Sequence, residues 1–294
     1  MYTTLIEPAD LLERYADPDW TVLDCRFDLA RPNWGREVYA AGHIPRALYA
    51  HLDEDLSGPI TPDSGRHPLP AVESLARTLG GWGVDGNVQV IAYDQGNGAY
   101  AARLWWLLRW LGHARVAVLN GGFAAWQQAG LPVSAESEVR AARQFTARPL
   151  QAAVVATSDV ARWVENGDLG RGAKTLIDAR AADRFAGQNE TLDPVAGHIP
   201  GARNHPFARN LDPSGRFLAA DTLRSSWTDT LAGSSPAQVV AMCGSGVTAC
   251  HNLLALEVAG LPGGRLYAGS WSEWIRDGRR PIDPPRRDGV DTKK

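Results

Sequence analysis

The chain contains Ala41-Gly-His-Ile-Pro45 and, 155 positions later, Ala196-Gly-His-Ile-Pro200. Two further blocks repeat in the same order at offsets of 154 and 148. They pair Thr21-Val-Leu-Asp24 with Thr175-Leu-Ile-Asp178, and Asn120-Gly-Gly-Phe-Ala-Ala-Trp126 with Ala268-Gly-Ser-Trp-Ser-Glu-Trp274. Three matches in one order, with a slowly drifting offset, indicate a tandem duplication of a whole domain.

Short apolar runs alternate with helical patterns in both copies. The runs cover residues 20–23, 88–93 and 116–119, then 175–177, 239–242 and 265–267, and the clearest helices cover 99–111 and 248–259. Unbroken apolar strands are typical of parallel sheets with helices on both faces. The sequence therefore predicts two α/β domains, residues 1–135 and 152–294, joined by a weakly periodic linker at 136–151.

The composition excludes several classes of function. A net charge of −3 gives no basic surface for nucleic acid. The most apolar run, 104–111, contains Arg109 and is too short to span a bilayer, and residues 1–10 show no targeting signal. The three cysteines are an odd, sparse set, which argues against a disulfide framework, and no pair has the C-x-x-C spacing typical of a zinc site. We therefore expect a cytoplasmic protein that binds neither membrane nor metal.

The loop after the strand at 239–242 carries the clearest chemical signal. Cys243 is its first residue, the glycines at 244 and 246 allow a tight turn, and a helix begins near Thr248. Backbone N–H groups of such a turn, together with the helix N-terminus, stabilise a thiolate or persulfide anion on Cys243. We expect Gly244, Gly246, Val247 and Thr248 to line this anion site, with Cys243 as the nucleophile. Cys25 and Cys250 are expected to be packing residues.

Two other interpretations of this loop fit less well. Residues 244–249 match G-x-G-x-x-A, but the strand at 265–267 ends without the acidic residue that a dinucleotide site requires. A phosphate-binding cysteine loop usually closes on an arginine six positions after the cysteine, where this chain has Ala249. A cysteine-dependent phosphatase therefore stays a weak alternative.

Together these motifs resemble the rhodanese and 3-mercaptopyruvate sulfurtransferase family. The resemblance is carried by residues 196–202, 267–274 and the Cys243 loop, and it covers nearly the whole chain. It implies two homologous rhodanese-like domains, of which only the second is catalytic. Asp94 stands where the first copy would need a cysteine and cannot carry sulfane sulfur, so the first loop is expected to be inert. The intact Cys243 argues against a non-catalytic binding module.

The resemblance also implies further site residues. Ser245 corresponds to a loop serine that is backed by a histidine and an aspartate of the first domain, here His67 and Asp53. Arg184 corresponds to the first of two arginines that hold the donor carboxylate, whereas Asp193 stands nine positions on, where the second would fall. His43 and His198 are expected to be structural.

The resemblance implies sulfur transfer through a Cys243 persulfide without metal or organic cofactor. The expected donor is 3-mercaptopyruvate, because the loop lacks the cations of thiosulfate-specific members, and thiosulfate is the alternative. The expected acceptor is a small thiol, a thioredoxin-like protein or cyanide. The sequence predicts no oligomeric state.

Overall fold

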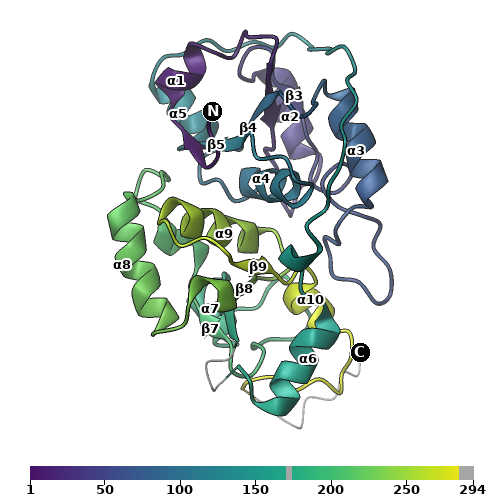
Figure 1. Cartoon of the computed structure of the whole chain (residues 1–294), viewed down its shortest axis with the longest axis vertical. Coiled ribbons are helices and arrows are strands. Elements are labelled where there is room, and N and C mark those ends of the chain that lie inside the picture. The colour runs from purple at the N-terminus through teal and green to yellow at the C-terminus, as the bar shows by residue number, and fades with distance from the viewer. Residues whose placement is uncertain (170–173, 285–294) are drawn as a thin grey trace.

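Two parallel sheets organise the chain, one in each half (Figure 1). The computed structural model describes residues 1–169 and 174–284; residues 170–173 and 285–294 of the predicted second domain lie outside the described part. The first sheet has the order β1-β5-β4-β2-β3 and the second β7-β6-β8-β9. The strands are β1 Leu5–Ile6, β2 Trp20–Asp24, β3 Leu48–Tyr49, β4 Gln89–Tyr93, β5 Val116–Leu119, β6 Thr175–Asp178, β7 Arg203–Asn204, β8 Val239–Met242 and β9 Arg265–Leu266.

Helices surround both sheets, as the sequence predicts. In the first half they are α1 Pro8–Leu12, α2 Trp34–Ala41, α3 Val72–Gly81, α4 Ala101–Trp110 and α5 Gly122–Gln128. In the second half they are α6 Thr157–Asn166, α7 Ala182–Phe185, α8 Ala220–Leu231, α9 Thr248–Val258 and α10 Ser270–Trp274, with short 3₁₀ helices η1 Gln151–Ala153, η2 Phe207–Asn210 and η3 Pro236–Gln238.

Both faces of each sheet are buried. In β2 and β4, Leu23 and Ala92 face one apolar core while Val22 and Ile91 face another, and β6 and β8 alternate in the same way. Continuous apolar strands in this sequence therefore reflect two-sided burial, and the predicted α/β fold with two tandem domains is confirmed.

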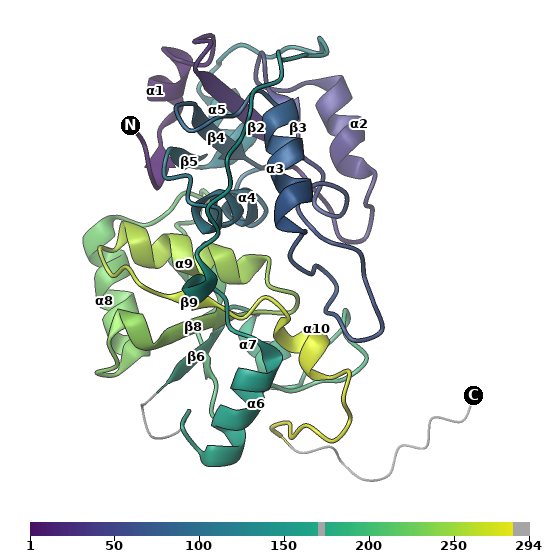
Figure 2. The same cartoon turned by 45° about the vertical axis from the view of Figure 1, so that its right-hand side comes forward.

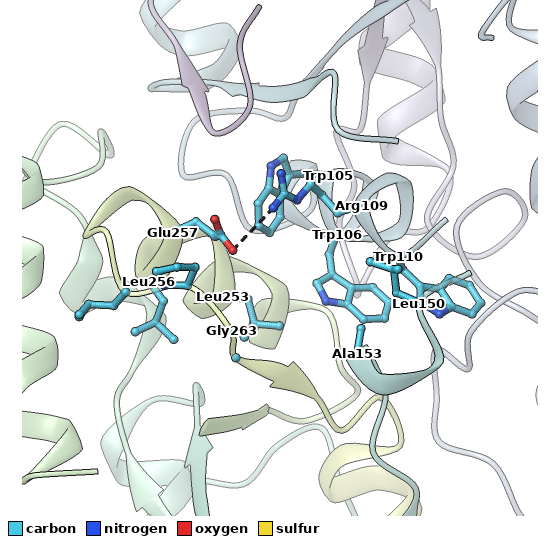
Figure 3. Close-up of a pocket in the computed structure, with 13 residues that line it drawn as sticks. Trp105, Trp106, Arg109, Trp110, Leu150, Ala153, Leu253, Leu256, Glu257 and Gly263 are labelled. Atoms are coloured by element: carbon cyan, nitrogen blue, oxygen red, sulfur yellow. Dashed lines mark ion pairs between the residues drawn. The ribbon is translucent and has the colours of Figure 1, made fainter. Parts of the chain in front are cut away.

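Helices α4 and α9 join the two halves. They lie against each other between the sheets (Figure 1), and the inner faces of both sheets belong to one continuous apolar core with them. At one end of this contact Trp105, Trp106 and Trp110 line a groove, and Arg109 forms an ion pair with Glu257 across it at 3.7 Å (Figure 3). Each large apolar side chain buried here contributes about 1.5–3 kcal/mol, so the shared core fixes the two halves against each other.

The connection between the halves is extended. Residues 135–150 contain no helix or strand and run along the first half toward α6 (Figure 2). Their backbone is hydrogen-bonded to that half: the Arg143 N–H donates to the Gly80 carbonyl at 2.9 Å and the Leu150 N–H to the Trp110 carbonyl at 2.8 Å. The exact boundaries at 135 and 152 stay predictions.

Candidate active site

Cys243 lies directly after the central strand β8, at the start of the loop that leads into α9. Its side chain is buried, and the Gly246 N–H donates a hydrogen bond to its Sγ at 3.1 Å. Gly246 has a φ of +79°, and a Cβ there would collide with the carbonyl of Ala268. The turn that aims this N–H at the sulfur therefore requires glycine.

Ser270, which the sequence analysis missed, holds the backbone of Cys243 in place. Ser270 accepts a hydrogen bond from the Cys243 N–H at 3.0 Å and donates one to the Tyr267 carbonyl at 2.9 Å. Ser270 is fully buried and has a φ of +53°, a conformation that costs about 1 kcal/mol or more outside glycine. A strained backbone in direct contact with the loop marks Ser270 as part of its support.

The corresponding loop of the first half is closed around its own carboxylate. Asp94 follows β4 as Cys243 follows β8. Its two oxygens accept hydrogen bonds from the N–H groups of Gly96 and Gly98 at 3.0 Å each, and of Tyr100 at 2.9 Å. This arrangement shows how such a loop holds a negative charge.

The structure brings Ser245, His67 and Asp53 together in one chain of hydrogen bonds. His67 Nδ1 lies 2.7 Å from Ser245 Oγ, and His67 Nε2 lies 3.2 Å from an oxygen of Asp53. Burial lowers the pKa of His67, and the hydrogen bond from His67 lowers the pKa of Asp53. A neutral His67 next to a carboxylate carries its proton on Nε2, which leaves Nδ1 to accept the Ser245 hydroxyl proton.

Both halves contribute to a cavity of about 280 Å³ that reaches Cys243. Predicted residues Gly244, Ser245, Val247, Thr248 and Arg184 line it. Gly246 contacts the sulfur without lining the cavity, and Asp53 lies behind His67 with 44% of its side chain exposed. The roles of all these residues stay predictions.

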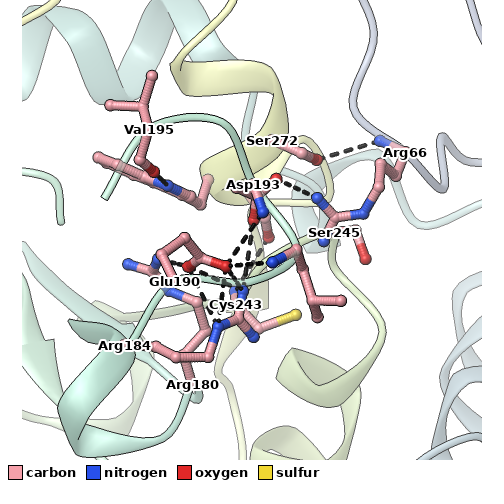
Figure 4. Close-up of polar contacts among 12 residues, drawn as sticks. Arg66, Arg180, Arg184, Glu190, Asp193, Val195, Cys243, Ser245 and Ser272 are labelled. Carbon is pink, nitrogen blue, oxygen red and sulfur yellow. Dashed lines mark hydrogen bonds and ion pairs between the residues drawn. The ribbon is translucent and has the colours of Figure 1, made fainter. Parts of the chain in front are cut away.

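Three arginines that line this cavity form a network with buried carboxylates behind them (Figure 4). Arg184 donates to Glu190 at 2.7 Å and to Asp193 at 3.4 Å. Asp193 is also ion-paired with Arg66 of the first half. Asp193, which stands where a second arginine was expected, thus pairs with both Arg66 and Arg184.

Arg66 is a cavity-lining cation that the sequence analysis did not assign. Its backbone N–H donates to Ser272 Oγ at 3.1 Å, and its guanidinium lies beside Gly244 of the cysteine loop. The repeat comparison could not identify it, because its position depends on how the two halves pack. Its place directly before His67 was the available signal.

The other cysteines and the two repeated histidines have surroundings that fit the expected structural roles. They are Cys25, Cys250, His43 and His198. Burial raises the pKa of Cys25 and raises that of Cys250 to about 12, so both stay thiols. His43 Nδ1 contacts the Tyr39 carbonyl at 2.7 Å, and His198 Nδ1 the Phe185 carbonyl at 2.8 Å. None of the four lines the cavity, although the Cys250 thiol donates to the Gly246 carbonyl of the cysteine loop at 3.3 Å.

A buried cysteine in the loop after a central strand, within a frame of two parallel α/β domains, defines a class of protein, and comparison identifies that class. The model of the Rhodanese-like domain matches residues 7–129 and 158–277, so the chain belongs to this family.

The names of individual relatives indicate which activity occurs among proteins similar to this chain. The chain is 47% identical to a probable 3-mercaptopyruvate sulfurtransferase of Pseudomonas aeruginosa, over 95% of this chain and 97% of the relative. It is 37% identical to a putative thiosulfate sulfurtransferase of Mycobacterium tuberculosis, over 89% and 90%. The solved 3-mercaptopyruvate sulfurtransferase from Leishmania major superposes with a TM-score of 0.81 at 31% identity, over 92% of this chain and 74% of that one. The predicted sulfurtransferase class is confirmed.

Proposed function

We propose that the chain moves sulfane sulfur from 3-mercaptopyruvate through a Cys243 persulfide to a thiol acceptor. The observation that carries this proposal is the hydrogen-bonded Ser245–His67 pair beside the buried cysteine. The Gly246 N–H that donates to Sγ supports the anionic states that sulfur transfer requires.

The first half-reaction balances without an external reagent. The Cys243 thiolate attacks the donor sulfur and forms the S–S bond, while the donor's C–S bond breaks and its electrons leave on the pyruvate enolate. The donor's thiol proton passes to Ser245 and His67 and then to the enolate carbon. The products are pyruvate and the Cys243 persulfide anion. Ser245 and His67 thus act as the acid–base pair.

The ion pairs of the arginines that line the cavity favour this donor over thiosulfate. Arg66 and Arg184 face carboxylates already, and Arg180 pairs with Asp178 at 2.7 Å. The cavity therefore offers little net positive charge to a dianion. A carboxylate that displaces Asp193 from the two arginines meets two guanidinium groups, which is the recognition a 2-oxo acid needs.

The second half-reaction passes the sulfur to an acceptor thiolate, which attacks the outer sulfur and regenerates the Cys243 thiolate. A small thiol or a thioredoxin-like protein fits this chemistry, and cyanide serves as an assay acceptor.

We place the reaction in the cytoplasm. In the described residues no helix is both long and apolar enough to cross a membrane.

Steady-state assays with both donors test the proposal. With a fixed thiol acceptor, 3-mercaptopyruvate should give the higher kcat/KM and release pyruvate. Equal or better turnover of thiosulfate would assign the chain to the thiosulfate branch. No sulfur transfer from either donor would reject the proposal.

A further inference from the structure

Arg103 is a fully buried cation without a carboxylate partner. It lies in the first turn of α4, in the half that carries no catalytic cysteine, and its side chain has no exposed surface. Among the ion pairs of residues 1–169 and 174–284, none involves Arg103. An isolated buried charge costs several kcal/mol, so its retention needs a compensating interaction.

Carbonyl groups supply only part of that compensation. The Arg103 guanidinium donates to the carbonyls of His67 at 3.2 Å, Leu56 and Pro68 at 3.3 Å each, and Gly246 at 3.3 Å. Its Nε also donates to the Leu56 carbonyl at 3.4 Å, and all five bonds are long. One group thereby connects the backbone of the His67 segment with that of the cysteine loop in the other half.

The negative charges that could neutralise Arg103 belong to cysteines. Burial lowers the pKa of Arg103, and a thiolate at Cys250 or Cys243 would oppose that shift. Arg103 donates to the Gly246 carbonyl at 3.3 Å, and the Gly246 N–H donates to Cys243 Sγ at 3.1 Å, so one loop residue contacts both the guanidinium and the sulfur. Arg103 and Cys250 are each the third residue of their helices, α4 and α9. Since burial raises the pKa of Cys250 to about 12, Cys250 remains a neutral thiol. Cys243 is therefore the group that can become an anion beside this charge.

The other charged groups around Cys243 largely neutralise one another. His67, which reaches the loop through Ser245, is held neutral by burial. The remaining arginines that line the cavity are ion-paired; these pairs are Arg66 with Asp193, Arg180 with Asp178 and Glu190, and Arg184 with Glu190 and Asp193. Among the described residues that line the cavity or contact the cysteine loop, Arg103 is the one cation without a carboxylate partner. Two nearby carboxylates also lack a cation: Asp53, beside neutral His67, and Asp94, which is held by backbone N–H groups of the first loop.

We propose that Arg103 is a positioning residue of the first domain whose unmatched buried charge stabilises the thiolate and persulfide anions of Cys243. It acts through space and through the Gly246 carbonyl, without touching the donor. The first domain thus contributes charge to the catalysis of the second. This inference rests on the proposed function only in taking Cys243 as the sulfur carrier.

The test measures thiolate reactivity, not turnover. The rate of Cys243 alkylation by iodoacetamide is followed against pH, with the modified cysteine identified by peptide mapping. Arg103→Gln keeps N–H donors but removes the charge, and should slow alkylation at pH 7 by about tenfold, moving the midpoint up by about one pH unit. Arg103→Lys keeps the charge and should stay within about threefold of the unaltered protein. Arg109→Gln, on the same helix, is the matched control and should change nothing.

An equal loss of alkylation rate in Arg103→Gln and Arg103→Lys would show that Arg103 only positions the backbone, and would overturn the charge role. An unchanged alkylation rate in Arg103→Gln would overturn it as well. If Arg103→Gln does not fold, Arg103→Met takes its place, since it keeps an unbranched stem without the charge. It should slow alkylation by the same factor, and an unchanged rate refutes the inference. Persulfide loading by 3-mercaptopyruvate is measured separately, so a failure of the proposed function remains distinguishable.

Discussion

Replacing His67 by alanine separates proton relay from sulfur transfer itself. His67 accepts the Ser245 hydroxyl proton on Nδ1 and donates to Asp53 from Nε2. 3-Mercaptopyruvate brings a thiol proton and leaves as an enolate that must gain one. Thiosulfate leaves as sulfite and needs no proton. The substitution should therefore affect the two donors differently.

The expected fall in kcat/KM follows from the loss of the Ser245–His67 acid–base pair. A positioned acid–base pair contributes about 10²–10⁴-fold, equivalent to roughly 3–5 kcal/mol of barrier. His67→Ala should lower kcat/KM for 3-mercaptopyruvate by that factor and leave thiosulfate within a few-fold. The variant also leaves the buried Ser245 hydroxyl without its partner, which costs about 1–3 kcal/mol of stability.

The assay compares both donors on His67→Ala at one pH, with His67→Gln as the control that retains a hydrogen-bonding group. Melting curves verify that each variant is folded. Equal losses for both donors would mean that His67 only holds the halves together. Unchanged turnover of 3-mercaptopyruvate would refute the relay.

Three further predictions follow from the same geometry. Arg184→Ala removes a charge-assisted hydrogen bond of about 1.5–3 kcal/mol and should lower kcat/KM for 3-mercaptopyruvate by roughly 10- to 100-fold, mainly through KM; an unchanged KM excludes Arg184 from donor binding. Asp53→Asn should reduce turnover of 3-mercaptopyruvate at least tenfold, since the wrong tautomer of His67 becomes favoured, and should spare thiosulfate. Burial lowers the pKa of His205 to about 4. The unfolded chain therefore takes up this proton first, so the free energy of unfolding should fall by roughly 3 kcal/mol between pH 6.5 and 4, and His205→Gln should flatten that slope in denaturant titrations.

The fold could be predicted because its signals are local. Central strands β5 and β8 were predicted with their observed bounds, and β4, α4 and α9 to within two residues, since two-sided burial leaves unbroken apolar runs. The edge strands β1, β3 and β7 were missed. Each has only two residues and shows no periodicity; β9 is as short but was predicted as the repeat counterpart of β5.

The site could be predicted only where residues lie in a motif. Cys243 and its glycines follow from the strand, turn and helix pattern, and Ser245, His67 and Asp53 from the family resemblance. Arg66 and Arg103 depend on the packing of one half against the other, which no local pattern encodes. In the sequence, Asp193 stands where the second donor-binding arginine was expected. In the structure it pairs with Arg66 of the other half.

Mass spectrometry of the protein after treatment with 3-mercaptopyruvate, without acceptor, tests the central claim most directly. We predict an added mass of about 32 Da on Cys243, no addition on Cys25 or Cys250, and loss of the adduct when a thiol acceptor is supplied. Sulfur on another cysteine, or full activity in Cys243→Ser, would contradict the account.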